Sequence, residues 1–314
     1  MTGSMKRIIV FFCLIVQMLT VAMAQTDNSG WMASLQDTVS VCRLSIPGTH
    51  DSGTAGVWFP MRHYARTQTM DLSRQWDAGI RFFDLRPKLE DGKLKIYHGP
   101  ANCHITFQEA LLILKDKLEL NPTEFCIVMT NSAGGGQTAV DMTMELISSV
   151  IPAGMLVDFR ADMTVSDMRG RILFIHRNAP SAGVDYPGVV TRGWYENGLS
   201  HQVRMLSKTD RSAVLWMQDC FTSGDNNPGR FLRSKWDMVY SQLNAFGKAD
   251  DGVWCINHAS GYTGKGVKTN IKRNSDTINA RLLDYLQDHH EPIGIIPMDF
   301  PPQELIDAII ECNK

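Results

Sequence analysis

Seven short apolar segments recur along the chain and limit the folds that are open to it. They are nearly continuous hydrophobic runs, which is typical of strands buried on both faces of a parallel sheet. The first ends at Pro47 and Gly48, two residues that stop a strand. The predicted strands are residues 43–47, 80–87, 124–131, 171–177, 213–221, 253–258 and 293–300.

Amphipathic helical segments separate these strands. A capping box formed by Thr106 and Glu109 opens a predicted helix over residues 110–120. Further helices are predicted over residues 138–150, 230–246, 274–288 and 303–312. Strand and helix alternate at roughly 40-residue intervals, as in a β/α barrel. We therefore expect an α/β fold with a TIM-type (β/α) barrel, irregular or incompletely closed. An open doubly wound sheet is the alternative, although no glycine-rich nucleotide turn follows the first strand.

The first 24 residues have the features of a secretory signal. Lys6 and Arg7 precede an apolar stretch, and Ala22-Met23-Ala24 is typical of a cleavage site with small residues. The apolar stretch is short for a helix that spans a bilayer, so a retained anchor is the less favoured alternative. We expect a secreted or periplasmic protein. Its remaining residues, 25–314, are expected to form one domain, because no linker or low-complexity tract divides them.

Charge and cysteine content restrict the partners and cofactors. The chain has 31 Lys and Arg residues, two of them in the predicted signal, against 33 Asp and Glu residues. The resulting mature net charge of about −4 argues against a nucleic-acid partner and against tight electrostatic binding to an anionic membrane. Six cysteines follow the signal, an even number that permits disulfides, although Cys126 and Cys255 lie in apolar strand-like runs. No Cys or His spacing indicates a metal site, and no cofactor is expected.

Polar side chains follow most of the predicted strands. His50 and Asp51 come directly after the first strand. Asp84 and Arg86 share one face near the end of the second, because strand side chains alternate. A short segment further on ends at His98, before a Gly-Pro pair. The later strands end with Asn131, Arg177, Asp219 and Asp299. Since the carboxyl ends of barrel strands meet in one mouth, we expect these residues to line a single active site.

This set of residue types suits the cleavage of a phosphodiester. Two histidines can serve as base and acid because imidazole gains and loses a proton near neutral pH. Arginine offers a fixed, bidentate cation to non-bridging phosphate oxygens. A carboxylate beside a histidine orients the ring and stabilises its protonated form. Taken singly, His50, His98 and Arg86 are each more readily explained as structural residues. Their combination at separate strand ends indicates catalysis.

Three motifs resemble the X region of bacterial phosphatidylinositol-specific phospholipase C. They are residues 45–52 (SIPGTHDS), 79–86 (GIRFFDLR) and 98–100 (HGP), and their order and spacing are similar to that family. The likeness continues in weaker form through Asp299 and covers nearly all of the chain from about Trp31 onward. The resemblance implies attack of the lipid's own inositol 2-hydroxyl on phosphorus, which releases diacylglycerol and leaves inositol 1,2-cyclic phosphate.

The resemblance also implies a role for individual residues. His50 would be the general base, supported by Asp299. His98 would be the general acid that protonates the diacylglycerol oxygen, and Asp51 would help to hold it. Arg86 would stabilise the charge that builds up on the phosphate. Positions that line the pocket and contact inositol hydroxyls are matched by Asp84, Arg177 and Asp219.

Two positions depart from the family pattern. Asn131 stands where the bacterial enzymes often have a lysine, and Phe221 stands where a tyrosine packs under the sugar. Phe221 keeps a stacking face but lacks the hydroxyl. Both residues are candidates for substrate binding. The preferred lipid stays open between plain phosphatidylinositol and a substituted or glycosylated form.

Arg86 bears on the metal question and on the alternative functions. Calcium-dependent relatives hold Ca²⁺ with carboxylate and amide oxygens, whereas a guanidinium at that place supplies a fixed cation. The resemblance therefore implies metal-independent cleavage. One alternative is a glycerophosphodiester phosphodiesterase, which would need a metal-binding carboxylate set near the first histidine. Another is a non-catalytic barrel that binds inositol phosphates or glycans, for which a base–acid pair has no use.

Several loops are candidates for contact with the lipid. Trp58 and Phe59 lie in a loop shortly after the first strand, where they could dip into a lipid interface. A local core under that loop is the equal alternative. Trp194 and Tyr195 are a further candidate for the rim, and residues 261–266 for a lid. We expect a monomer that touches an inositol phospholipid surface transiently.

Overall fold

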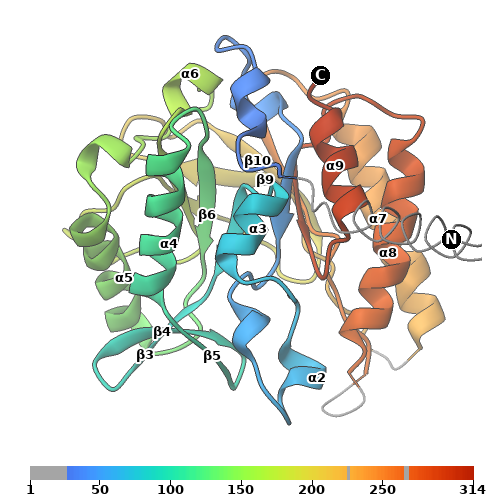
Figure 1. Cartoon of the computed structure of the whole chain (residues 1–314), viewed down its shortest axis with the longest axis horizontal. Coiled ribbons are helices and arrows are strands. Elements are labelled where there is room, and N and C mark those ends of the chain that lie inside the picture. Colours follow the sequence, from blue (N-terminus) through green and yellow to red (C-terminus); the bar gives the residue numbers. More distant parts are fainter. Residues whose placement is uncertain (1–26, 225–226, 265–268) are drawn as a thin grey trace, which may run out of the picture.

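The structure is a computed structural model that describes residues 27–224, 227–264 and 269–314. Within these residues, nine strands form a closed barrel in the order β1-β2-β6-β7-β8-β9-β10-β11-β12 and back to β1, with helices packed around it (Figure 1). They are β1 (Ile46–Thr49), β2 (Phe82–Leu85), β6 (Cys126–Thr130), β7 (Ile172–His176), β8 (Val189–Arg192), β9 (Leu199–Leu206), β10 (Val214–Gln218), β11 (Val253–Asn257) and β12 (Ile295–Met298). The prediction of an irregular TIM-type barrel is confirmed, and the sheet is closed rather than open.

Each of the seven predicted segments overlaps one barrel strand. The first prediction begins too early, because Val41–Arg43 forms a short 3₁₀ helix (η2) and β1 starts only at Ile46. Gly48 lets β1 approach β2 closely, since a Cβ at this position would lie 2.9 Å from Cβ of Phe82. The parallel pairing of β1 with β2 and with β12 brings the residues after these strands to one end of the barrel.

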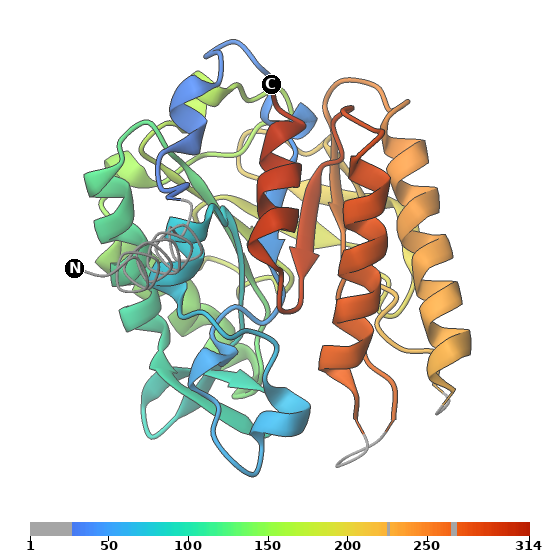
Figure 2. The same cartoon turned by 45° about the vertical axis from the view of Figure 1, so that its right-hand side comes forward.

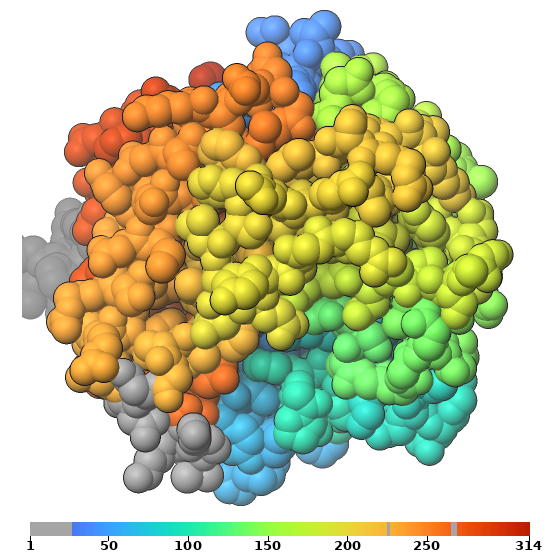
Figure 3. All heavy atoms as spheres, turned by 180° about the vertical axis from the view of Figure 1, so that it is seen from behind, coloured from blue at the N-terminus to red at the C-terminus, as the bar shows by residue number. Residues whose placement is uncertain are grey.

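The patterns did not predict β8 and β9. β9 runs antiparallel to both of its neighbours, β8 and β10. In the described residues between β7 and β10 no helix covers this side, and the yellow segment that contains β8 and β9 lies at the surface in Figure 3. Accordingly Val203 and Met205 of β9 are buried while Gln202 and Arg204 are exposed. An antiparallel strand with one face in solvent alternates apolar and polar residues, so it does not form a continuous apolar run in the sequence.

The five predicted helices are present to within a few residues of their predicted ends, whereas three short helices, Arg62–Ala65, Leu72–Ala78 and Val165–Met168, were not predicted. The capping box of Thr106 and Glu109 is present and begins α4. The helices are α2 (Arg62–Ala65), α3 (Leu72–Ala78), α4 (Phe107–Leu120), α5 (Gly136–Val150), α6 (Val165–Met168), α7 (Pro228–Phe246), α8 (Ile271–Leu286) and α9 (Gln303–Glu311). Further 3₁₀ turns are η1 (Trp31–Ser34), η3 (Thr54–Gly56) and η4 (Ala153–Met155). Figure 2 shows α7, α8 and α9 side by side against the barrel.

In strands such as β6, alternate side chains enter two apolar layers. In β6, Ile127 and Met129 belong to the cluster inside the barrel, whereas Cys126 and Val128 belong to the cluster beneath the helices. The inner cluster continues to Trp254 of β11 and to the residues before β1. Because this apolar filling occupies the amino-terminal side of the barrel, polar side chains are left to the carboxyl ends of the strands.

A small second sheet extends that polar end. It contains β3 (Pro87–Glu90), β4 (Lys93–His98) and β5 (Ala101–Thr106), paired in antiparallel fashion. Figure 1 shows this sheet and α2 together at the lower end of the barrel. The insertion between β2 and α4 thus brings His98, which ends β4, to the mouth of the barrel.

The structure bears in part on the predictions of a signal, of a lid and of disulfides. The predicted signal, residues 1–24, lies outside the described residues, as do positions 265 and 266 of the predicted lid. Within the described ranges no helix combines the length and apolarity that a bilayer crossing requires. The six cysteines after the predicted signal are all described, and each is a free thiol.

Candidate active site

A cavity of about 590 Å³ opens at the carboxyl ends of the barrel strands. Eight of the ten predicted site residues line it: His50, Arg86, His98, Asn131, Arg177, Asp219, Phe221 and Asp299. Asp51 and Asp84 do not line the cavity, because they are buried beneath it. The strand ends therefore meet in one mouth, as the barrel prediction requires.

His50 follows β1 and lies on the floor of the cavity. Its Nδ1 is 2.8 Å from Oδ1 of Asp299, the residue after β12. Gln68 donates to the backbone carbonyls of both His50 and Met298, which ties the ends of β1 and β12 together. Burial lowers the pKa of His50, but the carboxylates of Asp51 and Asp299 outweigh it and raise that pKa to about 9. In the free protein at neutral pH, His50 therefore carries two ring protons.

His98 faces His50 across the cavity. Its Nδ1 lies 2.7 Å from the backbone carbonyl of Ala65, at the end of α2. Because a carbonyl only accepts, this contact fixes the Nδ1 proton and leaves Nε2 for the cavity. The ring centroids of His50 and His98 are 6.2 Å apart and the ring planes make an angle of 79°.

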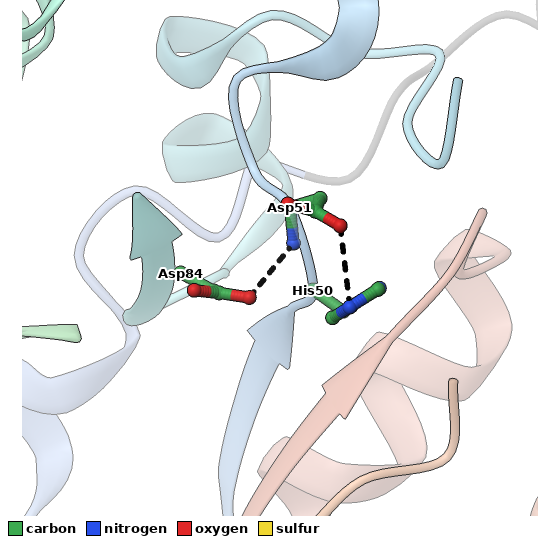
Figure 4. Close-up of side chains that lie close together, drawn as sticks. All are labelled: His50, Asp51 and Asp84. Carbon is green, nitrogen blue, oxygen red and sulfur yellow. Dashed lines mark hydrogen bonds and ion pairs between the residues drawn. The ribbon is translucent and has the colours of Figure 1, made fainter. Parts of the chain in front are cut away.

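Asp51 connects the two imidazoles from below. Its Oδ2 is 3.2 Å from Nε2 of His50 and 3.4 Å from Nε2 of His98. The residue has a positive φ of 45°, and its backbone N–H donates to Oδ2 of Asp84 at 3.2 Å. Figure 4 shows how the side chain of Asp51 reaches His50 while its backbone faces Asp84. One buried carboxylate thus serves both rings.

Arg86 lies between two carboxylates. Its Nε is 2.9 Å from Oδ1 of Asp51, and its Nη2 is 2.8 Å from Oδ2 of Asp84. Burial lowers the pKa of Arg86, but these two carboxylates raise it above its usual range. Burial raises the pKa of Asp84, whereas the charge of Arg86 holds it well below its usual range. The guanidinium is therefore fixed in place as a permanent cation.

The predicted role of Asp84 in contacting inositol is wrong. Its side chain has 0% exposure and its oxygens are committed to Arg86 and to the backbone of Asp51. Asp84 and Arg86 do lie on one face of the strand, as side-chain alternation predicts. The shorter side chain of Asp84, however, stays beneath that of Arg86. Asp84 thus orients Arg86 and cannot reach a bound ring.

One group of described residues, His50, Asp51 and Asp84, has the proximity that a metal ion needs, with ligand atoms within 4.8 Å of one another. Both carboxylates of this group already bind the guanidinium of Arg86. A metal ion would have to displace that cation. The donor set therefore fits a carboxylate–arginine cluster better than a metal site.

Arg177, the residue after β7, also lines the cavity. Its Nη2 lies 3.0 Å from Glu196, its Nη1 lies 3.8 Å from Asp219, and its guanidinium lies 4.4 Å from the centre of the Trp194 ring. The indole N–H of Trp194 donates to Oδ2 of Asp219 at 3.0 Å. Trp194 was expected at the rim, whereas Glu196 was not predicted. Both lie on the β8–β9 connection, whose strands were missed.

Aromatic rings and a third histidine complete the site. Phe221 stacks with Tyr262, with ring centroids 6.2 Å apart and an angle of 20°. His258, which follows β11, lies beneath the floor with its ring 6.0 Å from that of His50. Burial lowers the pKa of His258 to about 4, and neither ring nitrogen has a hydrogen-bond partner among the described residues. His258 is the last residue of the sixth predicted strand, and this position at a strand end could have identified it as a site residue.

The loop after β1 exposes two aromatic side chains. Trp58 is 64% exposed and Phe59 is 75% exposed, whereas Val57 before them is buried. The alternative of a local core is therefore wrong for these two residues. The ring of Trp58 stacks on that of His104 at 4.1 Å.

A closed β/α barrel that gathers acid–base side chains at the carboxyl ends of its strands is the architecture of a barrel enzyme. Its sequence is 26% identical over 298 residues to a 1-phosphatidylinositol phosphodiesterase of Listeria monocytogenes, covering 90% of this chain and 84% of that protein. A protein of the same name from Staphylococcus aureus is 30% identical over 119 residues, covering 37% of this chain and 38% of that protein. No family model matches the chain.

Solved structures give the same result for the fold. The phosphatidylinositol-specific phospholipase C from Listeria monocytogenes superposes with a TM-score of 0.74 at 24% identity, over 92% of this chain and 99% of that one. A variant of the Staphylococcus aureus enzyme superposes with a TM-score of 0.78 at 20% identity, over 92% and 98%. In sequence the chain is similar to 1-phosphatidylinositol phosphodiesterases, and in fold it is similar to phosphatidylinositol-specific phospholipase C, which supports the resemblance to the X-domain family.

Proposed function

We propose that the protein cleaves phosphatidylinositol, or a glycosylated phosphatidylinositol, to diacylglycerol and inositol 1,2-cyclic phosphate. The observation that carries this proposal is the pair of imidazoles, His50 and His98, whose rings lie 6.2 Å apart in a solvent-open cavity with Arg86 beside them. The names of the relatives, 1-phosphatidylinositol phosphodiesterase, supply the substrate class.

The two imidazoles would act as base and acid in one displacement. The inositol 2-hydroxyl attacks phosphorus and gives its proton to Nε2 of His50. A P–O bond to the 2-oxygen forms while the P–O bond to glycerol breaks, and Nε2 of His98 gives a proton to the leaving glycerol oxygen. His50 must therefore enter the step neutral and His98 protonated, and each can contribute ~10²–10⁴-fold.

The carboxylates would hold these states in place. Asp299 accepts from Nδ1 of His50 at 2.8 Å, which directs Nε2 to the substrate and stabilises the imidazolium that forms. Asp51 Oδ2 lies 3.4 Å from Nε2 of His98 and attracts the proton of the acid to that nitrogen. These contacts support the roles that the resemblance implies for His50, His98, Asp51 and Asp299.

Arg86 would stabilise the charge on the phosphoryl oxygens without a metal ion. Asp51 and Asp84 hold the guanidinium in one orientation, so little reorganisation is needed when negative charge develops. Because those two carboxylates are already paired with Arg86, we propose that the reaction is metal-independent.

The inositol ring would lie against one wall of the cavity. Arg177 and Asp219 offer a donor and an acceptor to ring hydroxyls, Phe221 offers an apolar face, and Asn131 offers an amide. All four line the cavity. The wall holds one cation between two carboxylates, Asp219 and Glu196, so it favours a neutral ring.

The substrate lies in a membrane, and the exposed loop fits that setting. Trp58 and Phe59 would insert transiently into a lipid surface and bring the cavity to the headgroup. We further propose a monomer that is secreted or periplasmic, on the basis of the signal-like residues 1–24. A mature amino terminus at Gln25 in the exported protein would test cleavage of that signal.

The proposal is tested by product analysis. Purified protein is incubated with phosphatidylinositol vesicles in excess EDTA, and phosphorus NMR follows the products. Inositol 1,2-cyclic phosphate is expected, with His50→Ala as the inactive control. Formation of glycerol phosphate, or activity only after calcium is added, contradicts the proposal.

A further inference from the structure

A buried lysine lies beneath the cavity and has no role in the proposed reaction. Lys235 belongs to the face of α7 that packs on the barrel, in a stripe with Phe231, Val239 and Phe246. Its side chain is 1% exposed. An ammonium in such a stripe is costly unless it is paired, so its partners indicate what it is for.

The hydrogen-bond partner of Lys235 is the amide of Gln218, the last residue of β10. Nζ donates to Oε1 of Gln218 at 3.1 Å, and the backbone N–H of Cys220 donates to the same oxygen at 2.7 Å. Nε2 of Gln218 donates to Oδ1 of Asn257 at 2.8 Å and to the carbonyl of His258 at 2.9 Å. All four hydrogen-bonding positions of this buried amide are filled.

Lys235 is one of three groups that set which way that amide points, together with the N–H of Cys220 and the carbonyl of His258. An ammonium donates and cannot accept, so it requires the oxygen of Gln218 on its own side. The amide nitrogen is thereby directed to Asn257 and His258 at the end of β11. Without the lysine, Oε1 of Gln218 keeps only the N–H of Cys220 as a donor in a buried site, so the amide is held less firmly against β10.

The bond to Cys220 matters for the cavity. Cys220 lies between Asp219 and Phe221, which both line the wall that would receive the inositol ring. The bond to Cys220 therefore helps to hold both side chains, together with the backbone bonds of Asp219 to Gly198 and of Phe221 to Asn197. Asp219 also accepts from the indole of Trp194, so the effect reaches the β8–β9 connection.

The charged groups around Lys235 also favour its bond to Gln218. Burial lowers the pKa of Lys235 to about 8, with Asp219, Cys220 and Asp299 acting against that decrease. His258 also faces this cluster from the end of β11. Near neutral pH the lysine is thus mostly a cation, and it makes a charge-assisted bond to Gln218.

We propose that Lys235 is a positioning residue, which acts through Gln218 to hold the Asp219–Phe221 wall of the cavity in its substrate-binding conformation. This inference rests on the proposed function only for the identity of the ligand. Lys235 and Gln218 make no hydrogen bond to His50 or His98 among the described contacts. Loss of Lys235 should therefore weaken binding of the ring more than it slows the chemical step.

The test compares Lys235→Met with Val239→Ala, a truncation on the same buried helix face that keeps the backbone carbonyl of residue 239, the acceptor of Asn257. With a short-chain, monomeric phosphatidylinositol, Lys235→Met should raise KM about 10-fold and change kcat about twofold or less. Lys235→Arg, which keeps a charged group that only donates, should restore most of the wild-type KM. If Lys235→Met does not fold, Lys235→Gln takes its place, because it can also accept and should again raise KM.

A second readout does not depend on activity. The indole N–H resonance of Trp194, assigned with Trp194→Phe, should move in Lys235→Met and stay in place in Val239→Ala. An unchanged KM and resonance in Lys235→Met would overturn the proposal, as would equal changes in Val239→Ala. If wild type does not cleave the lipid, the proposed function fails, while the resonance still tests the positioning role.

Discussion

The Nε2 atoms of His50 and His98 lie 3.2 and 3.4 Å from one oxygen, Oδ2 of Asp51. The rings are nearly perpendicular and their centroids lie 6.2 Å apart. Each ring is anchored from behind by its Nδ1, through Asp299 for His50 and through the carbonyl of Ala65 for His98. A base and an acid are thus held in place before substrate arrives.

The first prediction concerns the pH dependence of the base. His50 must be neutral to accept a proton, and its pKa in the free protein is raised to about 9. Because His50 must be neutral and His98 protonated, we expect a bell-shaped dependence of kcat/KM on pH, in which the alkaline limb breaks at the pKa of His50, about 9. Asp299→Asn removes one of the carboxylates that raise this pKa, so the alkaline limb should move to lower pH while kcat falls. A limb that stays in place in Asp299→Asn would exclude His50 as its source.

The second prediction concerns Arg86. Arg86→Lys keeps the charge but cannot bridge Asp51 and Asp84, which the guanidinium joins with contacts of 2.9 and 2.8 Å. We expect kcat to fall about 10²-fold or more, as for the loss of an aligned donor in a transition state. Arg177→Lys, elsewhere in the cavity lining, is the matched control and should act mainly on KM. Recovery of the Arg86→Lys variant by added Ca²⁺ would argue against the metal-independent proposal.

Most of the barrel could be predicted because its parallel strands are buried on both faces. β6 and β7 are fully buried, so each can be recognised as an apolar run, and in each the polar residue comes last. β9 could not be found in this way, since one of its faces meets solvent. Missing β8 and β9 also hid Glu196, which pairs with Arg177.

The sequence predicts most of the residues that form the site, but it does not predict how deeply each side chain is buried. A list of strand ends treats Asp84 and Arg86 alike, although 0% of Asp84 is exposed and Arg86 reaches the cavity. The contact between His98 and the carbonyl of Ala65 depends on the path of the loop through α2. Lys235 looked like an ordinary helix residue, because its burial follows only from how α7 docks on the barrel.

The third prediction concerns the membrane. Trp58→Ala and Phe59→Ala should each weaken binding to phosphatidylinositol vesicles about 10-fold, because each removes a large apolar side chain from the contact surface. Cleavage of a monomeric short-chain substrate should change little. Leu120→Ala is the control, since Leu120 is 78% exposed at the far end of α4. Vesicle sedimentation measures the binding, and equal losses in all three variants would contradict the assignment of the loop.

The fourth prediction concerns acid stability. His176 in β7 is fully buried, and burial lowers its pKa to about 4. Above pH 6.5, the pKa of histidine in the unfolded chain, His176 is neutral in both the native and the unfolded state. In that range it therefore does not change the free energy of unfolding with pH. As the pH falls from 6.5 toward 4, the unfolded state takes a proton that the native state does not, so stability decreases.

Removing this histidine should reduce that acid dependence. In His176→Gln, the slope of the free energy of unfolding against pH should fall by up to about 1.4 kcal/mol per unit in this range. The buried His258, whose pKa is also lowered to about 4, should account for a similar share. The raised pKa of His50 stabilises the protein below 6.5 and loses effect only toward 9, so it does not contribute here. Urea unfolding at several pH values measures the slope, and the exposed His290→Gln is the control.

The central claim is that His98 protonates the leaving glycerol oxygen while His50 activates the attacking hydroxyl. The most direct measurement compares His98→Ala and His50→Ala on phosphatidylinositol and on an inositol phosphate ester with a nitrophenyl leaving group. A nitrophenolate leaves without a proton, so His98→Ala should lose more than ~10³-fold on the lipid and far less on the activated ester. His50→Ala should be severely impaired on both. Equal losses of His98→Ala on the two substrates, or full activity of either variant on the lipid, would contradict the account.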